Sequence, residues 1–203
     1  MHKQQDLFHH AALAELTDAQ LFSQSYRFVA LDVETANANQ GSICQLGLAM
    51  VDHSGTIETA SFMIDPEVRF ATFNIQLHGI GPETVAGQPR FVDVINPLRD
   101  FLGRHPLVQH SPFDQKAISG ACQRYDLPDL KARWLNSVII ARKAWPQLRG
   151  NGGHGLGNLK KVLGLDFRHH DAAEDARAAA QVVLLAEAET GYNFIDSTRQ
   201  GSD

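Results

Sequence analysis

An apolar run from Phe28 to Thr35 carries two carboxylates two residues apart, Asp32 and Glu34. The run predicts a buried strand, and because side chains alternate across a strand, both acids project from the same face. A buried, unpaired carboxylate costs several kcal/mol or takes up a proton. A bound divalent cation removes this conflict. The pattern therefore predicts a metal site on a buried strand.

Composition places this strand in an ordinary globular chain. The 203 residues are 43% hydrophobic and 20% charged, enough to bury one substantial core. No apolar run approaches the roughly 18 residues of a membrane span, and the N-terminus lacks a signal pattern, so we expect no membrane partner. Cys44 and Cys122 are too few for a disulfide framework or zinc cluster. We expect a cytoplasmic protein with reduced thiols, and the oligomeric state stays open.

The net charge of −5 hides an asymmetry along the chain. Ten Lys or Arg and three Asp give residues 116–168 a charge of +7, which leaves −12 for the remainder. A basic face that follows phosphates could therefore lie beside an acidic, metal-binding pocket. Solvated helix faces are the alternative interpretation.

The order of apolar segments predicts an α/β fold. Apolar runs and turn residues predict five strands, at 26–34, 43–51, 56–64, 106–108 and 134–136. Helical spacing predicts five helices, at 91–103, 111–125, 138–145, 156–163 and 172–189, and Pro97 is expected to delay the start of the first. We expect a mixed five-stranded sheet, its first three strands antiparallel, with helices on both faces. Residues 26–190 form one domain in this interpretation, residues 1–25 an N-terminal appendage and residues 191–203 a C-terminal tail.

A third acid, Asp114, stands near the start of a predicted helix. Ser111 is a suitable N-cap for that helix. An acid in a first turn gains about 0.3–1 kcal/mol from the helix dipole, which alone would explain its presence. Asp114 also shares a helix face with Ala117, Ile118 and Ala121, which are core-type residues. We therefore expect its side chain to point toward the sheet.

A fourth acid, Asp175, lies one turn inside the last predicted helix. Asp171 is the expected N-cap, whereas Asp175 falls on the apolar stripe that includes Ala179. His170 precedes the cap and is free to lean over whatever Asp175 faces. A structural or solvent-facing histidine is the alternative, and the adjacent His169 makes the assignment less clean.

Together, the four acids Asp32, Glu34, Asp114 and Asp175 can converge at one edge of an α/β sheet. Mg²⁺ and Mn²⁺ prefer such oxygen ligands, and two ions about 3.5–4 Å apart suit phosphodiester hydrolysis. A histidine such as His170, with an ordinary pKa near 6.5, can take a proton from the attacking water.

Three ordered motifs resemble those of the DEDDh family of 3′–5′ exonucleases, which includes the proofreading epsilon subunit of bacterial DNA polymerase III. They are Leu31-Asp-Val-Glu-Thr35, His110-Ser-Pro-Phe-Asp114 and His170-Asp-Ala-Ala-Glu-Asp175. The resemblance implies a ribonuclease H-like fold and two bound Mg²⁺ or Mn²⁺ ions. It also implies metal ligands at Asp32, Glu34, Asp114 and Asp175 and a general base at His170.

The resemblance extends to substrate contacts and shows two departures. Thr35 and His78 would lie near the 3′ end, and residues 77–85 look like the loop that contacts the terminal nucleotide. Many members have Thr-Gly where this chain has Ala36-Asn37, and Asn where it has Ser111. These differences affect the surroundings of the terminal sugar and the turn at Asp114, but they remove no metal ligand.

We therefore expect a two-metal exonuclease that releases nucleoside 5′-monophosphates from the 3′ ends of single-stranded DNA or RNA. Phe70, Phe73 and His78 could stack on terminal bases. In the alternative interpretation, the two phenylalanines belong to the core and His78 is an ordinary surface residue. The choice between DNA and RNA depends on contacts to the 2′-hydroxyl, which the sequence does not reveal. A non-catalytic nucleic-acid-binding or adaptor module on the same fold, and an endonuclease of the wider ribonuclease H-like group, are rival hypotheses. A polymerase or repair complex is a narrower expectation for a partner.

Overall fold

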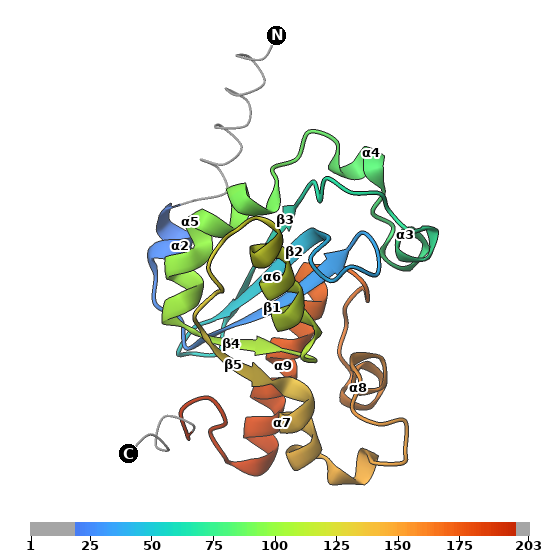
Figure 1. The fold of residues 1–203 in the computed structure, drawn as a ribbon. Helices are drawn as coiled ribbons and strands as arrows, with labels where there is room; N and C mark the ends of the chain where they lie inside the picture. Colours follow the sequence, from blue (N-terminus) through green and yellow to red (C-terminus); the bar gives the residue numbers. More distant parts are fainter. Residues whose placement is uncertain (1–18, 198–203) are drawn as a thin grey trace.

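The computed structural model describes residues 19–197, and its centre is one five-stranded sheet (Figure 1). The strand order is β3-β2-β1-β4-β5. β1 pairs antiparallel with β2, as β2 does with β3, whereas β1–β4 and β4–β5 are parallel. The strands are β1 Phe28–Thr35, β2 Ile43–Val51, β3 Ile57–Met63, β4 Pro106–Gln109 and β5 Arg133–Asn136. The predicted mixed α/β sheet is therefore confirmed.

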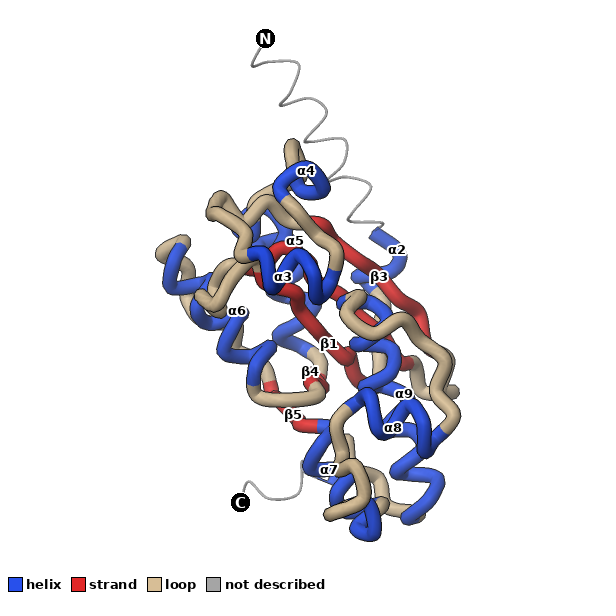
Figure 2. The backbone as a smooth tube through the Cα atoms, turned by 90° about the vertical axis from the view of Figure 1, so that its right-hand side faces the viewer, coloured by secondary structure: helices blue, strands red, loops and turns tan. Residues whose placement is uncertain are grey.

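Helices cover both faces of the sheet, as predicted (Figure 2). One face carries α7 Ser137–Ala144, α8 Leu156–Leu163 and the long α9 Ala172–Thr190. The other carries α2 Ala19–Ser23, α5 Phe91–Arg104 and α6 Phe113–Arg124. The remaining elements are the short helices α3 Thr72–His78 and α4 Pro82–Val85 and the 3₁₀ turn Pro146–Leu148. No helix among residues 19–197 is long and apolar enough to cross a membrane.

Strand β1 divides its side chains between two hydrophobic clusters, one on each face of the sheet. Val29 and Leu31 belong to the cluster under α5 and α6, whereas Phe28 and Ala30 belong to the cluster under α9. Asp32 and Glu34 continue the second row because side chains alternate along a strand. The two acids therefore project from the α9 side of the sheet, at the end of a row that begins in the core.

The first turn of α9 lies against strand β2 without space for a side chain between them. Gly47 is the cross-strand neighbour of Asp32, and a Cβ atom built on Gly47 would overlap the backbone of Ala172. The α9 face toward the sheet is also lined by small residues, among them Ala176 and Ala179, both buried. Because small side chains permit close approach, α9 can bring its first turn beside the acids of β1.

Three local features differ from the sequence-based expectation. Pro97 lies inside α5 rather than near its start; it is exposed, and the buried residues on both sides of it hold the helix against the sheet. Helix α6 begins at Phe113, although the Ser111 hydroxyl does accept a hydrogen bond from the Phe113 N–H at 3.1 Å. The segment predicted as a loop around residues 77–85 contains the end of α3 and all of α4.

The described residues beyond α9 pack against the domain. Phe194 and Ile195 are buried, and Arg27 donates to both carboxylate oxygens of Glu187 at 2.8 and 2.7 Å and to the Asn193 side chain at 3.0 Å. The domain limits at residues 26 and 190 stay predictions. Most of the predicted N-terminal appendage, and residues 198–203, lie outside the described residues.

We expect Gly47→Ala to lower the free energy of unfolding by at least about 2 kcal/mol, because the new methyl group must displace the backbone of α9. Chemical denaturation measures the change. Gly157→Ala is the matched control, since Gly157 is exposed in α8 and a Cβ there meets nothing within 4 Å. An unchanged stability in Gly47→Ala would contradict the close approach of α9 to β2.

Candidate active site

The four acids singled out in the sequence meet in one pocket of about 550 Å³. Carboxylate oxygens of Asp32, Glu34 and Asp175 lie within 4.8 Å of one another. Asp114 joins them from the first turn of α6, where its Oδ1 accepts a hydrogen bond from the Val33 N–H at 3.2 Å. Val33 stands between the two acids of β1, so this bond fixes α6 to the strand at the pocket. The predicted convergence of one strand and two helices is present in the structure.

Burial and mutual repulsion oppose ionisation of these acids. The pKa of Asp32 is raised well above its ordinary value by burial and then by Asp114, Asp175 and Glu34. Burial, followed by the charges of Asp175 and Asp114, raises the pKa of Glu34 to about 8. Burial raises the pKa of Asp114 to about 7 against the opposing hydrogen bond from Val33. Burial also raises the pKa of Asp175, although His169 opposes that shift.

This charge distribution fits a bound divalent cation. The residues that line the pocket include no Lys or Arg in the described part of the chain, so no protein cation of the lining neutralises the acids. Asp32, Glu34 and Asp175 present converging oxygen atoms, which are the ligands preferred by Mg²⁺ and Mn²⁺. Asp114 lines the same pocket and is available as a further ligand.

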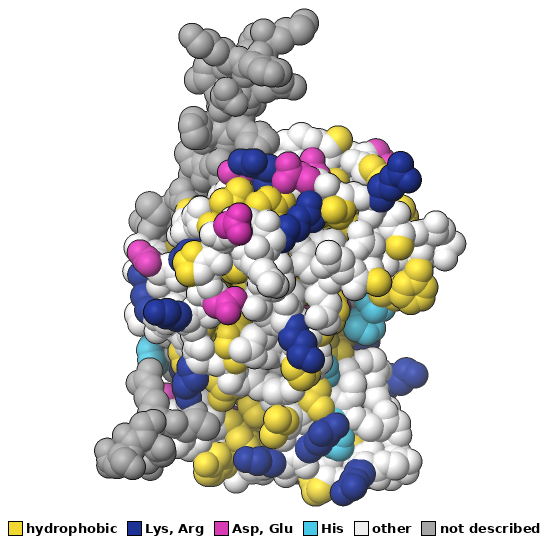
Figure 3. Space-filling view, viewed as in Figure 1, with side chains coloured by type: hydrophobic (Ala, Val, Ile, Leu, Met, Phe, Trp, Pro, Cys, Tyr) yellow, Lys and Arg dark blue, Asp and Glu magenta, His cyan; other side chains and the backbone are white. Residues whose placement is uncertain are grey.

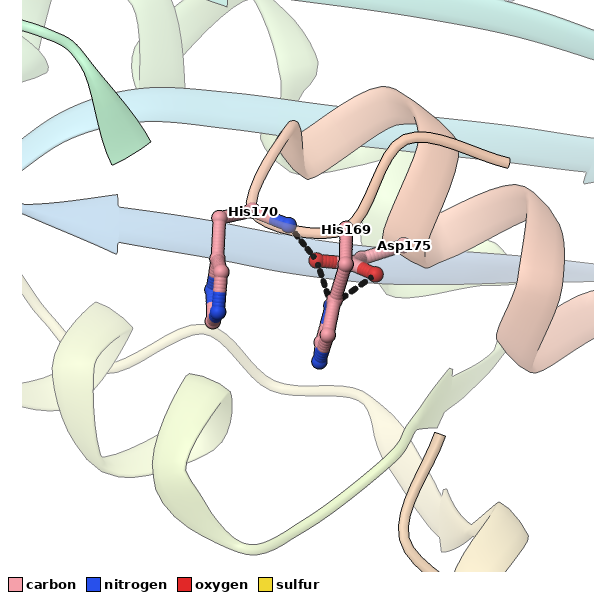
Figure 4. Close-up of side chains that lie close together, drawn as sticks. All are labelled: His169, His170 and Asp175. Carbon is pink, nitrogen blue, oxygen red and sulfur yellow. Dashed lines mark hydrogen bonds and ion pairs between the residues drawn. The ribbon is translucent and has the colours of Figure 1, made fainter. Parts of the chain in front are cut away.

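Two histidines stand over Asp175, and they contact it differently (Figure 4). The Nδ1 atom of His169 lies 2.8 and 3.0 Å from the two carboxylate oxygens of Asp175. His170 reaches Asp175 through its backbone N–H, which donates to Oδ2 at 2.8 Å. Its φ of +67° turns its ring alongside that of His169, with the ring centres 4.1 Å apart and the planes 10° apart.

Both imidazoles line the pocket, so His170 is available for the role that the motif predicts. Burial, followed by the neighbouring His169, lowers the pKa of His170 and keeps its ring neutral near pH 7. A neutral ring can accept a proton from water. The structure adds a feature that the motif did not specify, because the imidazole in contact with the Asp175 carboxylate is that of His169.

Gln45 of β2 positions the helix that carries Asp175. Its side-chain Oε1 accepts a hydrogen bond from the Ala172 N–H at 3.2 Å, while its Nε2 donates to the Ser61 hydroxyl at 3.1 Å. Gln45 is buried and is the cross-strand neighbour of Glu34. Sequence reasoning missed this role, although a lone amide in the otherwise apolar run of β2 was a visible signal.

The predicted substrate contacts occupy different environments. Phe73 lines the pocket with 71% of its surface exposed, in a suitable place for stacking on a base. The backbone carbonyl of Thr35 accepts hydrogen bonds from Asn74 Nδ2 at 2.8 Å and from His78 Nε2 at 3.1 Å. His78 is buried, and its Nδ1 accepts from the Ile80 N–H at 3.1 Å. Both ring nitrogens of His78 are thus bonded to main chain, and its contact with substrate stays a prediction.

Two further apolar side chains, Leu77 and Phe113, share the pocket lining with Phe73. They are 41% and 37% exposed respectively. Phe113 belongs to the second motif, but the sequence analysis assigned it no role of its own. Its place in the lining makes it a second candidate for base stacking.

His110, also in the second motif, holds the wall of the pocket. Its Nδ1 lies 2.8 Å from the Ser137 hydroxyl, and its Nε2 lies 3.0 Å from the carbonyl oxygen of His154. Burial lowers the pKa of His110 to about 4, so the ring is neutral near pH 7. His110 thereby fastens the glycine-rich segment 150–155 to the end of β4.

A family model described as RNase_T, exonuclease, matches residues 29–183. Curated relatives include the PolC-type DNA polymerase III of Streptococcus thermophilus, 27% identical over 162 residues, and that of Streptococcus pyogenes serotype M1, 27% identical over 175 residues. These matches cover 78% and 84% of this chain but only 11% and 12% of the relatives. The chain therefore spans about a tenth of their length.

Several solved structures share the fold. Exonuclease X in complex with 5′ overhanging duplex DNA matches with a TM-score of 0.62 and 22% identity, over 81% of this chain and 93% of that chain. The nuclease domain of 3′hExo, a DEDDh family member bound to rAMP, gives 0.66 and 20%, over 84% and 96%. Exonuclease I of E. coli with an oligonucleotide gives 0.70 and 17%, over 84% and 42%. At these identities the likeness establishes the fold.

We expect the metal-free protein to lose stability as the pH rises from about 4.5 to 8. Glu34 has an ordinary pKa of 4.5 and a folded-state pKa of about 8, so within this range the folded protein retains a proton that the unfolded chain has released. The melting temperature should fall by about 5 °C or more across the range. Added Mn²⁺ should reverse the loss at pH 8.

Glu34→Gln is the control for this measurement, since an amide does not titrate. The variant should show a weaker pH dependence and a smaller stabilisation by Mn²⁺. A melting temperature that rises in the metal-free wild type between pH 4.5 and 8 would contradict the raised pKa.

We expect Gln45→Met to weaken Mn²⁺ binding by about 10-fold, because loss of the acceptor for the Ala172 N–H lets the first turn of α9 move. Isothermal calorimetry measures the affinity. Ser61→Ala is the matched control: it removes the other partner of Gln45 and should change the affinity by no more than about 2-fold. Equal effects of the two substitutions would contradict the positioning role.

Proposed function

Because the chain belongs to the RNase_T family of exonucleases, we propose that it removes nucleotides one at a time from the 3′ end of single-stranded nucleic acid. Each cycle hydrolyses one phosphodiester bond and releases a nucleoside 5′-monophosphate, with two Mg²⁺ or Mn²⁺ ions as cofactors. The observation that carries this proposal is the convergence of the Asp32, Glu34 and Asp175 oxygens within 4.8 Å, beside Asp114 and two histidines.

The predicted enzyme class, a 3′–5′ exonuclease of the DEDDh type, agrees with the family and with the fold. All four acids and His170 stand in one pocket. Nothing in the described residues favours the non-catalytic adaptor hypothesis, since none of the five side chains is replaced or turned away from the pocket. The substrate and the number of ions are part of the proposal.

In this mechanism, Asp32, Glu34, Asp114 and Asp175 hold the cations. When bound, the cations supply Lewis-acid stabilisation of the charge that develops on the phosphate. A free ring nitrogen of His170 takes the proton of the attacking water. The new P–O bond forms to that water oxygen, and the bond to the 3′-oxygen of the preceding nucleotide breaks. The hydrogen bond from Val33 N–H holds Asp114 in place during this step.

The apolar side of the pocket would receive the terminal bases. Phe73, Leu77 and Phe113 are exposed in its lining and offer surfaces for base stacking, which tolerates any base sequence. Lys and Arg side chains gather on the lower part of the face in Figure 3, the region in which Figure 1 places α7 and α8. These two helices belong to the segment 116–168, which carries a charge of +7. These cations would attract the phosphates of the strand. Both DNA and RNA ends are candidates.

A polymerase is the first partner to test. The curated relatives carry the matching segment within a DNA polymerase III, of which it makes up 11%. We infer that the exonuclease can act on 3′ ends that a polymerase or repair complex presents to it.

The test uses labelled DNA and RNA oligonucleotides with free or blocked 3′ ends. We expect stepwise shortening from free 3′ ends in Mg²⁺ or Mn²⁺ and none in chelator. His170→Ala should slow the reaction by about 10²–10⁴-fold, the usual contribution of general acid–base catalysis. Asp175→Asn should abolish it, because an amide replaces a metal-binding carboxylate.

Exposed residues provide matched controls for these variants. His53→Ala and Asp100→Asn change the same residue types away from the pocket and should leave the rate unchanged. Equal cleavage of blocked substrates, or cleavage that survives the chelator, would overturn the proposal. Tight strand binding by the wild type without any shortening would favour the adaptor hypothesis.

A further inference from the structure

We propose that His169, His170 and Asp175 form a second metal site, selective for Zn²⁺ and similar transition metals, that overlaps the acidic cluster. One ligand atom from each of these three side chains lies within 4.8 Å of the other two. The site shares Asp175 with the cluster of Asp32 and Glu34. Its expected effect, inhibition by Zn²⁺, rests on the proposed exonuclease function, whereas binding of Zn²⁺ does not.

The contact between His169 and Asp175 has nearly the geometry of a shared metal ligand pair. Its Nδ1 faces both carboxylate oxygens, at 2.8 and 3.0 Å. Bonds from zinc to histidine and carboxylate ligands are about 2.0–2.2 Å long, which places two ligand atoms about 3.3 Å apart in a tetrahedral site. If His169 Nδ1 and Asp175 Oδ1 moved apart by about 0.5 Å, Zn²⁺ could therefore take the place of the hydrogen atom between them.

The surroundings already hold these side chains in place. The ring of Phe167, which is buried, meets the His169 ring edge-on with 5.8 Å between centres. The His170 N–H donates to Asp175 Oδ2, so Oδ1, which lies 2.8 Å from His169 Nδ1, is the oxygen that would face the cation. The His170 ring lies parallel to that of His169, 4.1 Å away (Figure 4). A modest rotation of the His170 ring would direct its nitrogen toward the same ion.

The donor set distinguishes this site from the acidic cluster. Two imidazole nitrogens and one carboxylate match the ligands of zinc, which often adds a water as its fourth ligand. The His169 side chain is 41% exposed, and the site opens into the pocket, so water can reach it. Mg²⁺ prefers oxygen ligands and would remain with Asp32 and Glu34.

The two sites exclude each other because each requires Asp175. A cation between Asp175 and the histidines would draw this carboxylate away from Asp32 and Glu34. It would also occupy the ring nitrogen of His170 that the proposed mechanism needs for a proton. Zn²⁺ at this place would therefore act as an inhibitor that Mg²⁺ or Mn²⁺ does not readily relieve.

The test measures metal binding without nucleic acid, by calorimetry on the metal-depleted 203-residue chain at one fixed pH. Zn²⁺ and Mn²⁺ are titrated separately into the wild type, His169→Ala and Glu34→Gln. We expect His169→Ala to weaken the tightest Zn²⁺ binding at least about 10-fold and to leave Mn²⁺ binding nearly unchanged. Glu34→Gln should show the converse. His53→Ala controls for surface histidines, since His53 is exposed outside the pocket.

Two further measurements show whether the variants are folded and whether nitrogen atoms bind the metal. His169→Gln preserves a polar side chain, and thermal unfolding of each variant shows whether it is folded. Co²⁺ as a probe should give a visible absorption band from nitrogen ligands in the wild type that is lost in both His169 variants. Zn²⁺ binding that survives in folded His169→Ala but is lost in Glu34→Gln would overturn the site. The expected binding pattern without nuclease activity would instead refute the proposed function alone.

Discussion

Asp32, Glu34, Asp114 and Asp175 share one pocket in which burial raises the pKa of each carboxyl group, and repulsion by neighbouring acids adds to the rise at Asp32, Glu34 and Asp114. Holding these acids together opposes folding near neutral pH, and the two hydrophobic clusters on either side of the sheet must offset that cost. The site and the core are parts of the same elements, because the row of side chains that begins at Phe28 in the core ends at the acids. This packing of buried carboxylates fits a bound divalent cation.

Close packing of α9 on the sheet makes the convergence possible. Gly47 lets the backbone at Ala172 lie directly over β2. The side-chain oxygen of Gln45 accepts a hydrogen bond from the N–H of Ala172, the first residue of α9. Both residues act on Asp175 from a neighbouring strand, without belonging to any of the motifs. A small residue and a buried amide therefore contribute to the geometry of the site together with the acids. His169 and His170 lie close to the same Asp175 carboxylate, which therefore belongs both to the acidic cluster and to the proposed zinc site.

Much of the fold could be predicted because regular elements have regular periods. Alternation along β1 and helical spacing in α6 and α9 placed the acids on the correct faces, and the structure brings them together. Prediction failed where the residue period of a strand or helix gives no information about the local structure. Pro97 lies within α5 because buried neighbours on both sides hold the helix, a tertiary effect that outweighs the local propensity. The period also gave no sign that both ring nitrogens of His78 are bonded to main chain, and the contact of His78 with substrate stays a prediction.

The sequence by itself determined which four carboxylates form the cluster and which faces of their elements they occupy, since these follow from the periods of strand and helix. Only the tertiary structure decided how the groups between regular elements are directed. His169 and His170 lie in a turn, where no period sets the side-chain direction, and the left-handed backbone of His170 places its ring beside that of its neighbour. The contact of His169 with Asp175 depends on where along β2 the first turn of α9 packs. That position is fixed by residues more than a hundred positions away in the chain, such as Gln45.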